Sequence, residues 1–274
     1  MDWIDLAERW IASEARIEAA HAPVAEALLA ASMLAEGEKV LDIGCGSGAT
    51  SLMAARAVGP AGAVIGSDIS DRMTERLAER AQGLDHVSTL PANAQTHVFE
   101  SDHDAVMSLF GVMFFDDSAA AFANIARALR PGGRMVFACW AGPPVNPWFS
   151  VLGRAAATHV PEMPPPDPSA PGPMRFADIA YVTDLLTQAG LTDVSAVEHA
   201  LHLTPSTDPA GTVDMLLHIG PLRGAVAQLS PPGTAEDRIA AIAADAVAGF
   251  TAFDGDDGLK VPCVIRIFSA QRPS

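Results

Sequence analysis

Positive charge is scarce in this sequence. Lysine and arginine together account for 17 of the 274 residues, against 33 aspartates and glutamates, so the formal net charge is −16 at pH 7. The two lysines, Lys39 and Lys260, lie far apart, and no run of basic residues occurs. Because the summed field of such a chain repels phosphate groups, the composition argues against a nucleic acid as substrate or partner.

Cysteine is also rare, with only Cys45, Cys139 and Cys263. The number is odd, each lies in or beside an apolar run, and no C-x-x-C pair occurs, which favours buried thiols over disulfide bonds or a metal centre. Neither a signal peptide nor an apolar run of membrane-spanning length is recognisable. We therefore expect a cytoplasmic protein with no bound metal and no membrane span.

The residues that are abundant predict a large folded core. Apolar residues make up 49% of the chain and charged residues 18%, which excludes global disorder. Short apolar runs alternate with segments of helical periodicity, and this rhythm predicts a doubly wound α/β fold around a mostly parallel sheet. The expected strands cover 39–43, 63–68, 86–90, 104–109 and 133–140, and the expected helices 49–58, 70–82 and 116–129.

A glycine-rich turn follows the first expected strand, over residues 40–48. Gly44, Gly46 and Gly48 break the strand before a helix opens, and such a turn presents backbone amides to a nucleotide-like ligand. Twenty residues later Asp68 ends a second apolar run, where its carboxylate can accept hydrogen bonds from both hydroxyls of a ribose. The turn and the carboxylate together predict an adenosine-containing cofactor.

The glycine spacing alone leaves a dinucleotide cofactor open. Gly44, Gly46 and Ala49 satisfy the alanine-ended form of the dinucleotide fingerprint, which would make the protein a nicotinamide-dependent oxidoreductase. Asp42, however, lies in the strand just before the turn, and a buried carboxylate beside a pyrophosphate is electrostatically poor. Beside a cationic ammonium or sulfonium group it is favourable, so Asp42 favours a different ligand.

Five segments in order make the chain resemble the class I S-adenosylmethionine-dependent methyltransferases, and in particular their small-molecule group typified by ubiquinone and menaquinone biosynthesis. The segments are 42–48, 66–70, 92–95, 104–115 and the Leu-x-Pro-Gly-Gly turn at 129–137. The resemblance implies a Rossmann-like sheet of seven strands, the last two forming an antiparallel hairpin at its edge. It also implies S-adenosyl-L-methionine as the cofactor and S-adenosyl-L-homocysteine as its product.

Carried over residue by residue, the resemblance implies a set of cofactor contacts at the ends of the first four strands. They are Asp42, Gly44, Cys45, Gly46, Gly48, Asp68, Ile69, Met73, Asn93, Ala94, Ser108 and Leu109. Several have structural alternatives: Asp42 as a pin for the turn, Asp68 as a helix N-cap, and Met73 as helix core. Asn93 departs from the aspartate usual in the family, so it would accept from adenine without charge assistance.

The rest of the chain divides around this core. Residues 1–35 are expected to form a helical cap, with a break between two helices at Ala22-Pro23. The core is expected to comprise 36–204 and 260–274, and 205–259 a helical insertion, with helices near 209–219, 221–228 and 234–250, that binds substrate. The proline-rich segment 141–175 is expected to be a lid with one short helix near 147–158. A homodimer formed through the insertion is an open expectation.

Apolar side chains just beyond the expected fourth and fifth strands are candidates for the substrate pocket, the alternative being packing against the N-terminal cap. They are Phe110, Met113, Phe114, Trp140 and Trp148. A general base is most often histidine, and His218 in the insertion is the candidate that can be delivered to the cleft.

We therefore expect in-line transfer of a methyl group from S-adenosylmethionine to a small, partly apolar acceptor. A protein that binds the same cofactor without methylating anything, and a nicotinamide-dependent oxidoreductase, are the alternatives.

Overall fold

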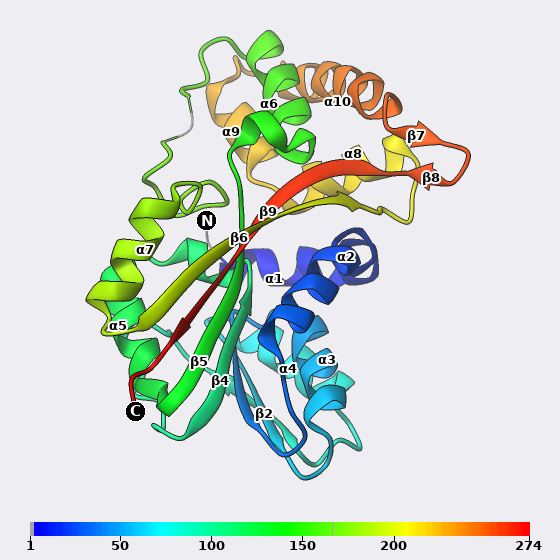
Figure 1. Cartoon of the computed structure of the whole chain (residues 1–274). Helices are drawn as coiled ribbons and strands as arrows, with labels where there is room; N and C mark the ends of the chain where they lie inside the picture. The colour runs from blue at the N-terminus through cyan, green and yellow to red at the C-terminus, as the bar shows by residue number, and fades with distance from the viewer. Residues whose placement is uncertain (1–2, 166) are drawn as a thin grey trace.

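The computed structural model describes residues 3–165 and 167–274, and the side chains from residue 6 onward. It confirms the expected seven-stranded sheet, whose order is β3-β2-β1-β4-β5-β9-β6 (Figure 1). The strands are β1 (Lys39–Ile43), β2 (Ala63–Asp68), β3 (Val87–Pro91), β4 (His103–Leu109), β5 (Leu129–Trp140), β6 (Thr192–Leu203) and β9 (Val261–Gln271). The last strand, β9, is antiparallel to both of its neighbours, and the other pairs are parallel.

Burial explains why the central strands are continuous apolar runs whereas the edge strand is not. Helices cover both faces of the sheet: α3 (Ala49–Val58) and α4 (Asp71–Arg80) on one face, α5 (Ser118–Ala128) and α7 (Ile179–Gln188) on the other (Figure 1). Strand β1 is buried along four of its five residues, while β6 at the edge has only one buried residue, its last. Parallel strands covered on both faces need no polar side, so their sequence does not alternate.

The N-terminal segment forms two helices, but the break between them is not where the sequence predicted it. Helix α1 (Trp3–Ala12) ends before Ser13, and α2 (Glu14–Ser32) runs through Pro23 without interruption. The predicted break at Ala22-Pro23 is therefore wrong. Proline has no N–H for the carbonyl of Ala19, and that carbonyl instead accepts the Thr204 hydroxyl at 3.1 Å.

The end of β6 thus holds the middle of α2. The backbone N–H of Thr204 also donates to the Ala20 carbonyl at 3.1 Å. These two hydrogen bonds satisfy backbone oxygens around the proline, which lets the helix continue. The helix is fixed to the sheet at the point where the chain leaves β6 for the insertion.

A group of helices, which we call the cap lobe, lies over the last residues of β6 and the first residues of β9 (Figure 1). Its members are α6 (Pro147–His159), α8 (Pro209–Ile219), α9 (Leu222–Leu229) and α10 (Ala235–Thr251), followed by the hairpin β7 (Asp254–Gly255) and β8 (Gly258–Leu259). The four helices predicted for these segments are all present. Helix α6 comes from the proline-rich segment but packs on α10 of the insertion, so the two segments form one structural unit.

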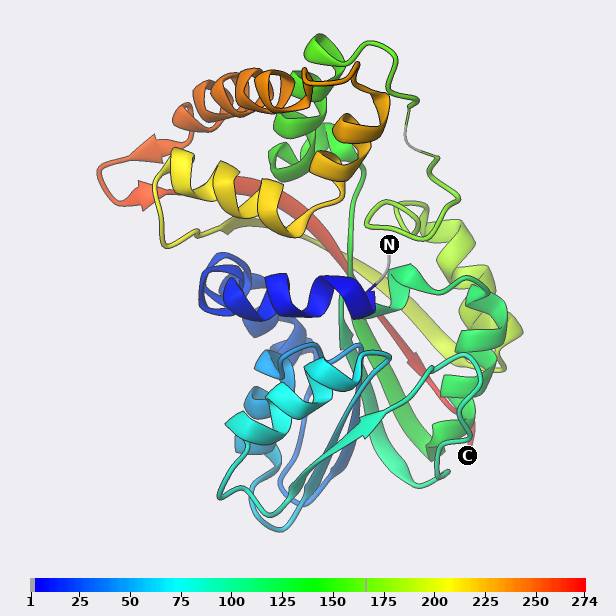
Figure 2. The same cartoon turned by 180° about the vertical axis from the view of Figure 1, so that it is seen from behind.

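Helices α1 and α2 lie between the cap lobe and the sheet (Figure 2). Helix α1 contacts α4 on one side and α8 on the other. Within the described residues, no helix has both the length and the apolar composition required to cross a membrane.

Candidate functional site

The glycine-rich turn joins β1 to α3 at the carboxyl edge of the sheet. The N–H groups of Gly44 and Cys45 both donate to the Ser67 carbonyl, at 2.8 and 3.1 Å, which ties the turn to the end of β2. Gly44 has a φ of +67°, and a Cβ there would lie 2.8 Å from the Cα of Gly111. Only glycine allows the turn and the loop after β4 to approach this closely.

Gly46 differs from Gly44 in what lies beside it. Its φ is +54°, yet a Cβ built on it would meet no atom within 4 Å. The backbone of the turn is therefore exposed to open space at its centre. An open, left-handed glycine at the carboxyl end of a parallel strand is where an α/β protein brings its main chain against a ligand.

Asp68 ends β2 and holds the turn through its carboxylate. One oxygen accepts the N–H of Gly46 and the other the N–H of Ser70, both at 3.0 Å. Burial raises the pKa of Asp68, and the hydrogen bonds from Ser70 and Gly46 oppose that shift. The N-cap residue of α4 is Ser70, so the N-cap interpretation of Asp68 is wrong, although its carboxylate binds the Ser70 N–H. The carboxylate still has lone pairs for ribose hydroxyls, and that contact remains a prediction.

Asp42 is fully buried in β1, beneath the turn. Its Oδ2 accepts hydroxyl hydrogen bonds from Thr50 and Ser51, both at 2.7 Å. Its Oδ1 is buried and has no hydrogen-bond partner among the described residues. Burial raises the pKa of this carboxyl to about 6, against the effect of the two hydroxyl groups. A buried acceptor without a donor is costly, so the site fits a ligand that carries a cationic N–H group.

The predicted adenine-side residues follow β2 and β3. Ile69 has an exposed side chain, whereas Met73 is buried in α4, which is the helix-core alternative. The Oδ1 of Asn93 accepts from the N–H and the side-chain amide of Gln95, at 3.0 and 3.2 Å. Ala94 is buried, and its carbonyl accepts from Asn124 at 2.8 Å. The Asn93 amide therefore shapes its own loop, and its contact with adenine remains a prediction.

The loop after β4 is held in a strained conformation. Ser108 is buried, and its hydroxyl accepts the N–H of Gly111 at 3.2 Å. Phe110 has a φ of +65°, which is rare for a bulky residue, and its N–H donates to the Ala138 carbonyl at 3.2 Å. This conformation turns the chain out of the sheet at Phe110, between the end of β4 at Leu109 and the short 3-10 helix η1 (Gly111–Phe114). Strain of this kind is typical of functional sites.

Four rings from four different elements meet just beyond this loop, and we call them the aromatic cluster. Phe110 stacks on Trp140 at the end of β5, with centroids 4.3 Å apart and an interplanar angle of 8°. The His21 ring of α2 lies edge-on to Phe110, Trp140 and Trp148, at 5.8, 5.9 and 5.6 Å. The structure thus brings together three of the predicted substrate residues and packs them against His21 of the N-terminal segment, which was the alternative; their contact with substrate remains a prediction. Met113 is fully buried and Phe114 partly buried, and both belong to the main core.

His21 was not among the residues that the sequence singled out. Its imidazole Nδ1 lies 2.8 Å from the Ile17 carbonyl, and burial lowers its pKa against the effect of that hydrogen bond. The one local signal was its position two residues before Pro23, in the helix that precedes the first strand. His218, the predicted base, has an exposed side chain on α8, and its backbone carbonyl accepts from Arg9 at 3.2 Å. Its catalytic role remains a prediction.

Charged side chains link the N-terminal helices to α4. Three arginines one turn apart, which we call the arginine ladder, pair with glutamates of α1 and α2: Arg72 with Glu8, Arg76 with Glu14, and Arg80 with Glu18. Hydrogen bonding to Arg76 lowers the pKa of Glu14. Arg80 also donates to the Ser47 carbonyl at 3.0 Å, so the ladder reaches the glycine-rich turn.

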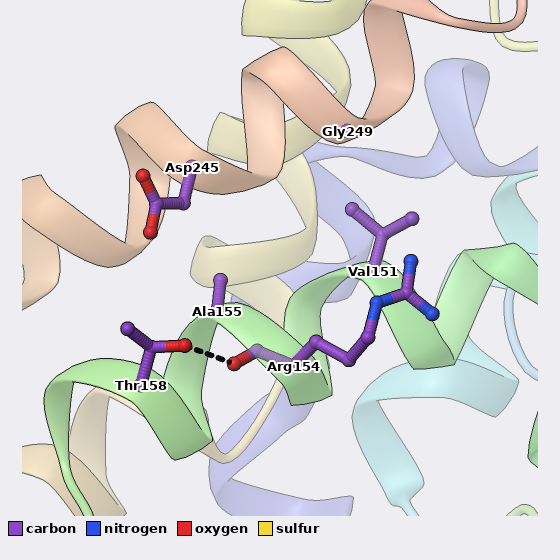
Figure 3. A pocket seen from close by; sticks show the side chains of 6 residues that line it. All are labelled: Val151, Arg154, Ala155, Thr158, Asp245 and Gly249. Atoms are coloured by element: carbon purple, nitrogen blue, oxygen red, sulfur yellow. Dashed lines mark hydrogen bonds between the residues drawn. The ribbon is translucent and has the colours of Figure 1, made fainter.

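A separate hollow of about 180 Å³ lies within the cap lobe, between α6 and α10 (Figure 3). Its lining consists of Val151, Arg154, Ala155, Thr158, Asp245 and Gly249. Figure 3 shows that these side chains come from the facing sides of the two helices. The hollow contains no residue of the glycine-rich turn or of the aromatic cluster, so it is a feature of helix packing distinct from the predicted cofactor site.

Comparison with known proteins places this site in a family. A family model described as a methyltransferase domain matches residues 40–133. The chain is similar to aklanonic acid methyltransferase of a Streptomyces species, with 36% identity over 149 residues that span 51% of this chain and 68% of the relative. It is also similar to nocamycin O-methyltransferase of Saccharothrix syringae, with 32% identity over 198 residues that span 68% and 71% of the two chains.

A solved structure shares the fold. It is a phosphoethanolamine N-methyltransferase of Haemonchus contortus in complex with S-adenosyl-L-methionine, with a TM-score of 0.53, 19% identity, and coverage of 92% of this chain and 53% of the other. Together with the sequence relatives and the arrangement of Asp42, the glycine-rich turn and Asp68, these similarities identify the family. The chain belongs to the class I S-adenosylmethionine-dependent methyltransferases that act on small molecules.

Proposed function

We propose that this protein transfers the methyl group of S-adenosylmethionine to a small, partly apolar acceptor, with Asp42 and Asp68 holding the two polar ends of the cofactor. The observation that carries the proposal is the buried, unpartnered Oδ1 of Asp42. An ammonium group at the methionine end of the cofactor would donate to this oxygen and neutralise its charge. A pyrophosphate would do neither, which disfavours a nicotinamide cofactor.

The remaining cofactor contacts follow from the turn. Gly46 has open space beside it, and its N–H is bound to Asp68, so the ribose would lie beside both the turn and this carboxylate. Ile69 is exposed beside them, where it can cover the adenine ring. Backbone groups of Ser108 and Leu109, at the end of β4, would hold the amino-acid end of the cofactor together with Cys45 and Gly48.

The aromatic cluster, with Met113 and Phe114 behind it, would hold the acceptor. The bound cofactor supplies an electrophilic methyl group on a sulfonium. The protein's main task is then to align the acceptor atom with that methyl group, and alignment alone can contribute on the order of 7–11 kcal/mol in good intramolecular reactions. Apolar rings also exclude water, which would otherwise compete with the acceptor.

The wider organisation supports the same function. Residues 1–35 would form a cap, 36–204 and 260–274 the cofactor-binding core, and 205–259 the substrate-binding insertion. Because α6 packs on α10, part of the proline-rich lid would belong to the same unit as the insertion. A homodimer through the insertion and a location in a reducing cytoplasm remain part of the proposal, the latter because Cys45, Cys139 and Cys263 are free thiols.

Isothermal titration with S-adenosylmethionine, S-adenosylhomocysteine and NADH tests the cofactor assignment. We expect micromolar binding of the first two and no heat from NADH. Binding of NADH alone would contradict the proposal. Tight binding of both S-adenosyl compounds without transfer to any acceptor would instead favour a binding protein with no methylating role.

A further inference from the structure

His21 contacts the loop that packs against the cofactor-binding turn. Its ring is 5.8 Å from that of Phe110, and the next residue, Gly111, packs directly on Gly44 of the turn. One residue of this loop therefore contacts the imidazole and the next contacts the turn. The imidazole is also the one titratable group in the aromatic cluster, since its three ring neighbours are phenylalanine and tryptophan.

The hydrogen bond to Ile17 fixes which nitrogen of His21 can act as a base. A carbonyl oxygen only accepts hydrogen bonds, so Nδ1, 2.8 Å from it, carries the proton in the neutral ring. Nε2 then presents its lone pair, and the hydrogen bond that the His21 ring forms within the described part of the chain is that of Nδ1. Burial lowers the pKa of the ring, which keeps the lone pair available at neutral pH.

The backbone around His21 is held from outside its own helix. Thr204 bonds the carbonyls of Ala19 and Ala20, the two residues before the histidine. Pro23 makes this possible, because it leaves the Ala19 carbonyl without its usual helical donor. Thr204 is thus a positioning residue that fixes the backbone next to His21 relative to the end of the sheet.

The surroundings also limit the kind of acceptor. Aromatic rings attract a flat aromatic body at centroid distances of about 4.5–7 Å. The three rings facing His21 carry no positive charge, so they favour a neutral hydroxyl over an ionised carboxylate. A neutral hydroxyl can enter and then give up its proton to a base within the site.

We propose that His21 is a general base that removes the proton from a phenolic or enolic hydroxyl of a flat, aromatic acceptor. This rests on the proposed function and deepens it. As the acceptor oxygen forms its bond to the methyl carbon, the O–H proton moves to Nε2 and the bond between sulfur and methyl breaks, its electron pair remaining on sulfur. The products are an aryl or enol methyl ether, S-adenosylhomocysteine and the His21 imidazolium, which returns the proton to water.

The probe for this proposal is 7-hydroxycoumarin, a flat phenol whose neutral and ionised forms absorb at different wavelengths. The full chain, saturated with S-adenosylhomocysteine, is titrated with the probe at a pH below the probe's own pKa. We expect the wild-type protein to bind the probe and to increase its ionised absorption band. His21→Asn, whose amide can still donate to Ile17, should bind within about threefold of wild type but without the ionised band.

Turnover gives the second readout. With S-adenosylmethionine, His21→Asn should transfer methyl to the probe about 100- to 10,000-fold more slowly, the usual contribution of a general base. Imidazole added to His21→Ala should restore part of the rate, which a purely structural role would not allow. His202→Gln, which changes an exposed histidine at the end of β6, is the matched control and should behave as wild type.

The outcomes separate this inference from the proposed function. Wild type that fails to bind S-adenosylhomocysteine contradicts the proposed function itself. If the cofactor binds normally and His21→Asn transfers methyl within threefold of wild type, only the role of His21 is overturned. A loss of transfer in His218→Gln but not in His21→Asn would overturn the same role. Wild type that binds the cofactor but neither binds nor ionises the probe overturns the acceptor class.

Discussion

The predicted cofactor site and the predicted acceptor site, which we call the cofactor side and the acceptor side, contain different kinds of groups. On the cofactor side, backbone amides and two carboxylates, buried Asp42 and half-buried Asp68, surround the glycine-rich turn. On the acceptor side, three apolar rings surround one imidazole. The cofactor side therefore carries negative charge at neutral pH at a cost in stability, whereas the acceptor side carries apolar rings and one imidazole. A charged cofactor requires oriented polar groups around it, whereas a neutral acceptor requires apolar surroundings and a group that can take up its proton.

The close approach of two backbone segments on the cofactor side should be the most sensitive to change. Gly44→Ala places a methyl group 2.8 Å from Gly111 at a φ of +67°. Overpacking and left-handed strain should together lower the free energy of unfolding by about 2–4 kcal/mol and abolish measurable cofactor binding. Urea denaturation and titration calorimetry measure the two effects.

Gly83→Ala is the matched control for this substitution. Gly83 has a φ of +85° but nothing within 4 Å of a Cβ, so it isolates the strain from the clash. We expect a loss of about 1–2 kcal/mol and unchanged cofactor binding. Equal effects at the two glycines would contradict the importance of the Gly44–Gly111 contact.

Asp42→Asn should separate stability from binding. The Asp42 pKa rises from 3.8 to about 6, so between these values the native state holds a proton that the unfolded state has lost. Stability therefore falls as pH rises from about 4 to 6 and stays low above, by up to about 3 kcal/mol. The variant should remove that loss and be more stable at pH 7, yet bind S-adenosylmethionine more weakly. Thermal unfolding from pH 4 to 8 would show it; an unchanged pH profile would count against this assignment.

Asp68→Ala tests the ribose contact. It removes two backbone hydrogen bonds and the predicted acceptor for the ribose, and we expect S-adenosylhomocysteine affinity to fall by about 10- to 100-fold. Asp85→Asn, at an exposed loop position, is the control and should leave affinity unchanged. Retained affinity in Asp68→Ala would reduce this carboxylate to a structural role.

The smallest effect should come from the arginine ladder that joins the two sides. Its ion pairs are partly exposed, and such pairs contribute about 0–1 kcal/mol. Glu14→Gln should lower stability by no more than about 1 kcal/mol, and added salt should reduce even that difference. A loss several times larger would show that the N-terminal helices are held mainly by charge.

The cofactor side could be read from the sequence because its signals are local. The turn at 44–48 and Asp68 lie within one βαβ unit, where strand, glycine and helix patterns follow one another directly. The segments of the insertion were predicted for the same reason, since helical periodicity is a property of neighbouring residues.

The acceptor side could be read only in part. Phe110, Trp140 and Trp148 were recognised because they lie at or beyond the ends of strands. His21 joins them from a helix whose course depends on Thr204, 185 residues away from its partner Ala19. The same long-range contact explains why Pro23 does not break α2. Propensity predicts what proline removes from a helix, but not which distant donor replaces it.

The most direct test of the account compares S-adenosylhomocysteine with 5′-methylthioadenosine, which lacks the amino-acid end, across pH. Asp42 must lose its proton to bind the ammonium group, so affinity for S-adenosylhomocysteine should weaken by about tenfold from pH 7 to pH 5, given a pKa of about 6. Affinity for 5′-methylthioadenosine should not weaken in this range. The same pH dependence for both ligands would contradict the central claim that Asp42 holds the charged end of the cofactor.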